Sequence, residues 1–163
     1  MKIAITGGTA GIGQAIAKVF EDQGHEVIAL SRRNGYHIRS LPKISAMIEP
    51  CDMLINNAQV GFAQTELLFE IWRRWQGKQK YIVNVGTQMT DLLLPPKVEW
   101  DEYIIQKKAL DLATQLLEQR NEWPRLLLVR PGNIATQPGQ QPPEYMDVDE
   151  YAQGVTAWIA KNI

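Results

Sequence analysis

Short apolar runs alternate along this chain with stretches in which apolar residues recur every three or four positions. The runs predict buried strands over residues 2–6, 25–31, 52–56, 80–85 and 125–129. The periodic stretches predict helices over residues 12–23, 41–48, 65–75, 101–120 and 147–161. Strands that alternate with helices are typical of βαβ units. We expect a doubly wound α/β fold with a mostly parallel, Rossmann-like sheet and helices on both faces.

Two segments break this alternation. Asn34-Gly35 follows the second predicted strand, and Asn-Gly between extended segments is a strong hairpin signal. We therefore expect residues 36–39 to form a short antiparallel arm, a third strand reached without a crossover helix. Residues 137–146 are rich in Pro, Gly and Gln and predict an irregular loop.

Length and composition limit the class of protein. A chain of 163 residues, 45% of them hydrophobic, suits one globular domain over residues 1–163. The net charge of −1 offers no electrostatic attraction to nucleic acid or to an anionic membrane. Cys51 is the single cysteine, and no apolar run has the length of a signal peptide or a membrane span. We expect a soluble, cytoplasmic protein with no metal site.

The stretch TGGTAGIG, residues 6–13, follows the first predicted strand and opens the first predicted helix. A glycine-rich turn in this context binds phosphate. Gly7 would permit the tight turn, Gly11 would let the backbone approach a pyrophosphate, and Gly13 would let the helix pack on the sheet. The helix N-terminus would present N–H groups and the positive end of its dipole to the anion. A turn without a ligand is the alternative, which the strand–turn–helix–strand context disfavours.

Five motifs in order along the chain resemble those of the short-chain dehydrogenase/reductase family. They are TGGTAGIG for its TGxxxGxG, LINNAQ (54–59) for its NNAG, YIVNVGT (81–87) for its fifth strand, YIIQKKA (103–109) for its YxxxK and RPGNIAT (130–136) for its PG-x-I/V-x-T. Each match is weak alone, but their shared order disfavours coincidence. An epimerase-type relative is a poorer match, because its turn reads TGxxGxxG and position 14 here is Gln.

The resemblance implies a dinucleotide cofactor and the residues that hold it. The implied cofactor-binding residues are Gly7, Thr9, Gly11, Ile12, Gly13, Ser31, Arg32, Arg33, Asn57, Ala58, Tyr103, Lys107, Pro131, Gly132, Ile134 and Thr136. An acidic residue at the end of the second strand would favour NAD by binding its ribose 2′-OH. The chain instead carries Ser31-Arg32-Arg33, and a hydroxyl with guanidinium groups suits a 2′-phosphate. We expect NADP(H), with solvated arginines beside the Asn-Gly turn as the alternative.

The implied catalytic residues are Thr87, Tyr103 and Lys107. Tyr103 and Lys107 lie four residues apart on a predicted helix and so share a face. The Lys107 ammonium, with the oxidised nicotinamide, would lower the pKa of Tyr103 and make it a proton donor and acceptor. By the resemblance, Lys107 also binds the nicotinamide ribose and Thr87 holds the substrate oxygen. The expected reaction is hydride transfer between NADP(H) and a small carbonyl or alcohol; a surface tyrosine is the alternative.

The chain is shorter than usual members of this family. Its predicted helix 65–75 lacks the Asn that many members use as a fourth catalytic residue, Gln59 replaces the last Gly of NNAG, and the substrate loop after Thr136 is reduced. Two functions therefore stay open: an NADPH-dependent carbonyl reductase with an open site, or a non-catalytic NADP(H)-binding sensor or scaffold.

The resemblance also implies an oligomeric state. It favours a homodimer formed through helices 65–75 and 101–120. Trp72 and Trp75 in the first of these helices would be interface anchors or core residues.

Overall fold

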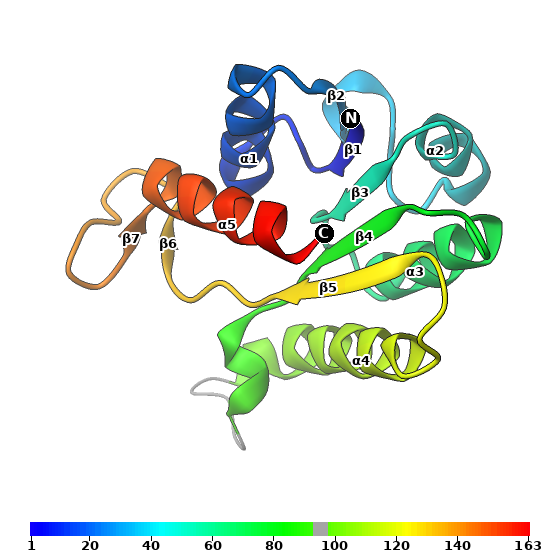
Figure 1. Cartoon of the computed structure of the whole chain (residues 1–163). Coiled ribbons are helices and arrows are strands. Elements are labelled where there is room, and N and C mark those ends of the chain that lie inside the picture. Colours follow the sequence, from blue (N-terminus) through cyan, green and yellow to red (C-terminus); the bar gives the residue numbers. More distant parts are fainter. Residues whose placement is uncertain (93–97) are drawn as a thin grey trace.

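A five-stranded parallel sheet forms the centre of the chain in a computed structural model that describes residues 1–92 and 98–163 (Figure 1). The strand order is β2-β1-β3-β4-β5. The strands are β1 (Lys2–Thr6), β2 (Glu26–Leu30), β3 (Met53–Asn56), β4 (Tyr81–Val85) and β5 (Arg125–Val129). All four pairings are parallel, which confirms the fold class predicted from the alternation of strand and helix.

Helices cover both faces of this sheet (Figure 1). One face carries α1 (Gly11–Asp22) and α5 (Val148–Asn162); the other carries α2 (Leu41–Ile48), α3 (Ala63–Arg74) and α4 (Asp101–Glu118). Side chains of a strand alternate between the two faces. Ile3 and Ile5 accordingly pack with α1 and α5, whereas Ala4 packs with α2, α3 and α4. Both helical layers thus rest on buried strands.

The predicted antiparallel arm at residues 36–39 is wrong. Arg32–Asn34 form a single 3₁₀ turn, η1, and the chain then enters α2 without a strand. The reason lies in Asn34, whose Oδ1 accepts the Ser31 N–H at 2.8 Å while its Nδ2 donates to the Ala29 carbonyl at 2.6 Å. Gly35 takes a left-handed φ of 85° as the C-cap of this turn. Asn-Gly therefore closes the chain on the end of β2 and not onto another strand.

The predicted irregular loop at residues 137–146 ends in a short strand. Met146–Asp147 form β7, which pairs in parallel with β6 (Ile134–Ala135). Asp147 then caps α5, because its Oδ1 accepts the N–H groups of Asp149 and Glu150 at 2.9 and 3.0 Å. The loop is thereby anchored at both ends beside the carboxyl edge of the sheet.

Trp72 and Trp75 are core residues. Their exposures are 8% and 0%, and the Trp75 indole N–H donates to the Glu49 carbonyl at 3.2 Å. Of the two interpretations, that of core residues is confirmed, because both indoles pack in one cluster with buried residues of α2 and α4.

Among residues 1–92 and 98–163, no helix combines the length and hydropathy needed to cross a membrane. Within the same residues, no group of three His, Cys, Asp or Glu side chains is arranged to hold a metal ion.

Candidate functional site

The predicted site residues gather at one edge of the sheet, beyond the carboxyl ends of its strands. The glycine turn follows β1, Ser31 follows β2, Asn57 follows β3, Thr87 follows β4 and Pro131 follows β5. Ligands of open α/β sheets bind at this edge. Five motifs that are far apart in the sequence are thus brought together by the parallel topology.

The glycine turn has the geometry that an anion site requires. Gly7 and Gly11 have φ values of 70° and 51°, which disfavour any residue with a Cβ. A Cβ at Gly13 would lie 2.5 Å from the Gly7 carbonyl oxygen and 2.7 Å from Asn57 Nδ2, so helix and turn touch there. The N-cap Ala10 offers no side-chain hydrogen bond, and the first N–H groups of α1 stay available to a ligand.

Asn57 and Ala58 join the ends of β1 and β3. Their backbone N–H groups both donate to Thr6 Oγ1 at 2.9 Å, and Asn57 Nδ2 donates to the Thr6 carbonyl at 3.0 Å. Gln59, which replaces the usual glycine, donates through Nε2 to Gln106 Oε1 on α4. The NNAQ segment therefore holds the sheet beneath the glycine turn.

The segment after β2 lines a pocket of about 250 Å³ together with Gly7, Thr9 and Ala58. The Ser31 hydroxyl accepts from Thr9 Oγ1 at 2.8 Å and donates to Asn34 Oδ1 at 3.3 Å, so hydrogen bonds within the protein already use it. Arg33 Nη1 donates to the Thr9 carbonyl at 3.3 Å. The exposed Arg32 side chain makes no hydrogen bond or ion pair within the described part of the chain, so Arg32 is the free cation of this pocket.

Lys107 is buried between α3 and β4, with 3% of its surface exposed. Its Nζ donates to Gln64 Oε1 at 2.9 Å and to the Val85 carbonyl at 2.8 Å, and it lies 5.8 Å from the Tyr103 ring centroid. Burial lowers the pKa of Lys107 to about 8, while the nearby Asp111 carboxylate acts in the opposite direction. The predicted shared helix face of Tyr103 and Lys107 is confirmed.

Tyr103 is partly buried and hydrogen bonded to the side chain of Thr87. Burial raises the pKa of Tyr103, and the hydrogen bond to Thr87 offsets part of this rise. Lys107 is not among the causes that act on this pKa in the protein alone, and a lowering by Lys107 together with the oxidised nicotinamide stays a prediction. Tyr103 is thus a protonated phenol at neutral pH, held beside the Thr87 hydroxyl.

Gln64 is a site residue that the sequence patterns missed. It is 2% exposed, and its Nε2 donates to the Asn56 carbonyl at 2.6 Å and to the Val85 carbonyl at 3.0 Å. These contacts aim Oε1 at Lys107. Gln64 lies one residue before the predicted helix 65–75. The one sequence signal for its role is a polar Gln next to apolar neighbours. Helix 65–75 lacks the Asn expected from the resemblance, but Lys107 has a polar side-chain partner in Gln64.

Two adjoining pockets meet at Thr87 and Tyr103. The first, of about 230 Å³, is lined by Ile12, Asn57, Thr87, Tyr103, Lys107, Pro131, Gly132, Ile134 and Thr136. The second, of about 620 Å³, is lined by Thr87, Gln88, Met89, Asp91, Leu92, Tyr103, Gly132, Asn133, Ile134 and Tyr145. A third, of about 820 Å³, runs from Gly11 and Thr136 along α1 to Lys18. The hydroxyl pair therefore separates a cavity bordered by the implied cofactor residues from a wider outer cavity.

Comparisons with known proteins bear on the fold and on the first part of the chain. The family model described as the NAD dependent epimerase/dehydratase family matches residues 3–73, less than half of the chain. This match spans the glycine turn, although the spacing of that turn is not the one expected of an epimerase, and it ends before Thr87 and Tyr103. No curated protein sequence matches the chain.

Solved structures show the same fold. A short chain dehydrogenase from Burkholderia cenocepacia J2315 in complex with NADP has a TM-score of 0.79 at 18% identity, covering 98% of this chain and 84% of its own. A bulky-bulky ketone specific alcohol dehydrogenase from Comamonas testosteroni has a TM-score of 0.75 at 18% identity, covering 98% and 82%. A 3-alpha-hydroxysteroid dehydrogenase from Pseudomonas sp. B-0831 complexed with NADH has a TM-score of 0.64 at 21% identity, covering 96% and 88%.

Proposed function

We propose that this chain, which has the fold of the short-chain dehydrogenases/reductases, is an NADP(H)-dependent oxidoreductase that interconverts a small carbonyl compound and its alcohol. The observation that carries the proposal is the grouping of Thr87, Tyr103 and Lys107 around one pocket. Tyr and Thr hydroxyls beside a buried ammonium provide a proton donor, an oxygen-binding group and a positive charge together.

The residues at the carboxyl edge fit a dinucleotide. The turn at Gly7 and Gly11 offers backbone N–H groups to a pyrophosphate, and the pocket beside Arg32 has the place and the charge for the adenosine ribose phosphate. Pro131 and Thr136 line the pocket that would hold the nicotinamide. When bound, NADPH supplies the hydride that the carbonyl carbon accepts.

Each catalytic side chain has a role that follows from its hydrogen bonds. An ammonium has three N–H donors. Lys107 donates one N–H to Gln64 and another to the Val85 carbonyl, which leaves its third N–H for a cofactor ribose hydroxyl. Thr87 Oγ1 accepts the Met89 N–H at 3.3 Å and is hydrogen bonded to Tyr103, so a substrate oxygen would bind where these two hydroxyls meet. Tyr103 transfers its phenolic proton to that oxygen as the carbonyl carbon is reduced.

The raised pKa of Tyr103 favours this role in the direction of reduction. A phenol is protonated below its pKa, so burial keeps the proton on Tyr103 throughout the neutral range. Proton donation to an alkoxide is then available without a prior protonation step. In the reverse direction Tyr103 must first lose that proton, which a higher pH assists.

The proposed activity is tested by turnover of NADPH with a panel of small ketones, aldehydes and quinones. We expect consumption of NADPH that depends on both protein and carbonyl compound, with formation of the alcohol. NADPH binding without turnover of any compound would contradict the enzymatic function and favour a redox sensor or scaffold of the same fold.

Arg32 sets the expected preference for NADPH over NADH. A charge-assisted hydrogen bond to phosphate is worth about 1.5–3 kcal/mol, so Arg32→Asp should weaken NADPH binding roughly 10- to 100-fold and leave NADH binding equal or tighter. Titrations of the tryptophan fluorescence with each cofactor measure both affinities. Lys78→Asp, an equal change of charge at the opposite end of the sheet, is the control. Unchanged affinities in the Arg32→Asp variant would show that the phosphate binds elsewhere.

We also propose that two copies pair through the outer face of α4 together with α3. Ile105, Leu112 and Leu116 form an apolar stripe on α4 with exposures of 58%, 57% and 54%. Leu112→Asp should shift the protein from dimer to monomer in sedimentation velocity, whereas Gln153→Asp on the opposite side of the sheet should not. A wild-type protein that sediments only as a monomer would contradict the pairing.

A further inference from the structure

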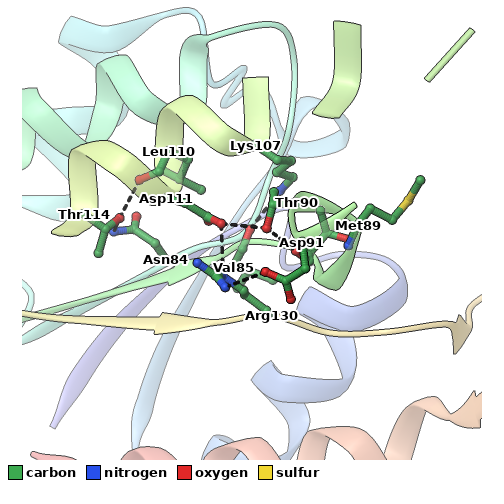
Figure 2. Close-up of polar contacts among 11 residues, drawn as sticks. Asn84, Val85, Met89, Thr90, Asp91, Lys107, Leu110, Asp111, Thr114 and Arg130 are labelled. Carbon is green, nitrogen blue, oxygen red and sulfur yellow. Dashed lines mark hydrogen bonds and ion pairs between the residues drawn. The ribbon is translucent and has the colours of Figure 1, made fainter. Parts of the chain in front are cut away.

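Asp111 is a buried carboxylate on α4, one helical turn after Lys107. Its side chain is 7% exposed, and it lines neither of the two pockets that Tyr103 borders. Figure 2 shows the Asp111 carboxylate with dashed lines to Thr90 and to Arg130. A buried charge is costly unless its partners are well placed. Apart from its charge effect on Lys107, no role assigned above to the pocket residues involves this carboxylate.

Three chain segments meet at this carboxylate. Thr90 Oγ1, on the loop η2 (Gln88–Asp91), lies 2.8 Å from Asp111 Oδ2 and 2.9 Å from the Thr87 carbonyl oxygen. Arg130 Nε, after β5, lies 3.0 Å from the same Oδ2. A Cβ at Gly86 would lie 2.9 Å from Oδ1, so the backbone before Thr87 also packs on the carboxylate. The segments before and after Thr87 are thereby fixed to α4.

Each connected segment carries part of the proposed site. The η2 loop begins directly after Thr87, α4 carries Tyr103 and Lys107, and Arg130 directly precedes Pro131-Gly132. The Gln88 N–H donates to the Pro131 carbonyl at 3.0 Å, which joins two of these segments a second time. Asp111 is therefore the point at which Thr87, Tyr103 and the segment 130–132 are held in one arrangement.

The surroundings of Asp111 act on its pKa in both directions, with a net rise. Burial raises the pKa of Asp111, and the Asp91 carboxylate adds to this rise. The hydrogen bond from Thr90 and the charges of Arg130 and Lys107 act against it. Arg130 Nη1 also pairs with Asp91 at 3.1 Å, where the Asp91 side chain is 67% exposed. The cationic partners of the buried carboxylate thus come from α4 and from the segment after β5.

We propose that Asp111 is a positioning residue that fixes Thr87 and the Arg130–Gly132 segment relative to Tyr103 and Lys107. The effect on turnover rests on the proposed function, whereas the effect on backbone order does not.

Hydrogen exchange tests the positioning without any need for turnover. Asp111→Asn keeps the shape of the side chain but removes its charge, and we expect faster amide exchange over residues 86–91 and 129–132. Thr90→Val removes one contact without leaving Arg130 unpaired from Asp111, and should accelerate exchange over residues 86–91 alone. Glu118→Gln, at the exposed end of the same helix, is the matched control. Unchanged exchange in both variants would overturn the proposal, as would a Thr90→Val change spread evenly over the chain.

Kinetics separate positioning from a loss of stability. Misplaced reacting groups lower the rate roughly 10- to 100-fold, so kcat should fall in both variants while the Kd for NADPH changes less than about threefold.

The wild-type kcat/KM for NADPH should fall as the pH rises through about 8, because the Lys107 ammonium is lost there. Asp111→Asn should move this fall to lower pH, since a neighbouring negative charge no longer favours the ammonium. A pH profile that stays in place would contradict the assigned arrangement.

The two proposals can fail separately. If wild-type protein shows no turnover but Asp111→Asn still accelerates exchange over residues 86–91, the proposed function fails and the positioning stands. If wild-type protein turns over and neither exchange nor kcat responds to Asp111→Asn and Thr90→Val, the positioning fails alone.

Discussion

The Tyr103→Phe variant should reduce carbonyl compounds roughly 100- to 10,000-fold more slowly than wild type, the range that a positioned general acid contributes. Phenylalanine fills the same space but has no proton to give, so the substrate oxygen would carry uncompensated charge as its carbon is reduced. The hydrogen bond to Thr87 is lost as well. Cofactor binding should change by less than about tenfold, because Lys107 and the glycine turn are untouched.

The rate and the affinity are measured separately, by NADPH consumption and by quenching of tryptophan fluorescence. Tyr81→Phe is the matched control, since Tyr81 lies at the amino end of β4, away from the pockets. We expect this control to retain wild-type turnover. Activity that persists in the Tyr103→Phe variant would remove Tyr103 from the mechanism.

Gly13→Ala should disable the dinucleotide site at its first turn. The added Cβ would lie 2.5 Å from the Gly7 carbonyl oxygen, a backbone atom that cannot rotate away. Overpacking of this kind costs about 1–3 kcal/mol of unfolding free energy. The turn must shift to relieve the contact, and this shift should weaken the binding of NADPH. Each 1.4 kcal/mol lost from the binding free energy lowers the affinity about tenfold.

The neighbourhood of Gly154 makes it the matched control for this substitution. Gly154 is also helical, on α5, and a Cβ there meets no atom within 4 Å. Gly154→Ala should therefore stabilise the protein by about 0.5–1 kcal/mol, the usual gain from alanine over glycine in a helix. In thermal unfolding, Gly13→Ala should lower the stability of the protein and Gly154→Ala should raise it. In NADPH titrations, only Gly13→Ala should lose affinity. Equal behaviour of both variants would contradict the close approach at Gly13.

The shortness of the chain does not remove any strand that the site needs. The sheet order β2-β1-β3-β4-β5 places β2 and β5 at the edges, and each predicted site segment follows one of these five strands, apart from Tyr103 and Lys107 on α4. The chain passes from β2 to α2 through the single η1 turn. A site built entirely beyond the carboxyl ends of five parallel strands can therefore tolerate shortening at the edge of the sheet.

Much of this arrangement was predictable from the sequence because it depends on periodicity and on local order. The five buried strands are short apolar runs, and the site motifs directly follow them. Parallel pairing then brings the glycine turn, Asn57 and Thr87 to the same edge whatever the details of the loops, and α4 adds Tyr103. The resemblance to short-chain dehydrogenases/reductases is confirmed at the level of the fold.

The remainder depends on contacts between distant side chains, which leave no periodic signal. Asn34-Gly35 suits a hairpin and a capped 3₁₀ turn equally, and the hydrogen bond to Ala29 decides between them. Gln64 contacts Lys107 across 43 residues, and Asp111 contacts the Thr90 side chain across 21. The pKa of Tyr103 is set by how deeply the phenol is buried, which the spacing to Lys107 does not reveal.

The most direct test of the central claim is to follow the hydride itself. NADPH that carries deuterium at the transferable position of its nicotinamide is incubated with the protein and the carbonyl panel, and the alcohol is analysed by mass spectrometry. With wild-type protein we expect alcohol that carries one deuterium on the former carbonyl carbon. With Tyr103→Phe we expect almost no labelled alcohol. Alcohol without deuterium, or no alcohol from a protein that binds NADPH, would contradict an NADPH-dependent carbonyl reductase.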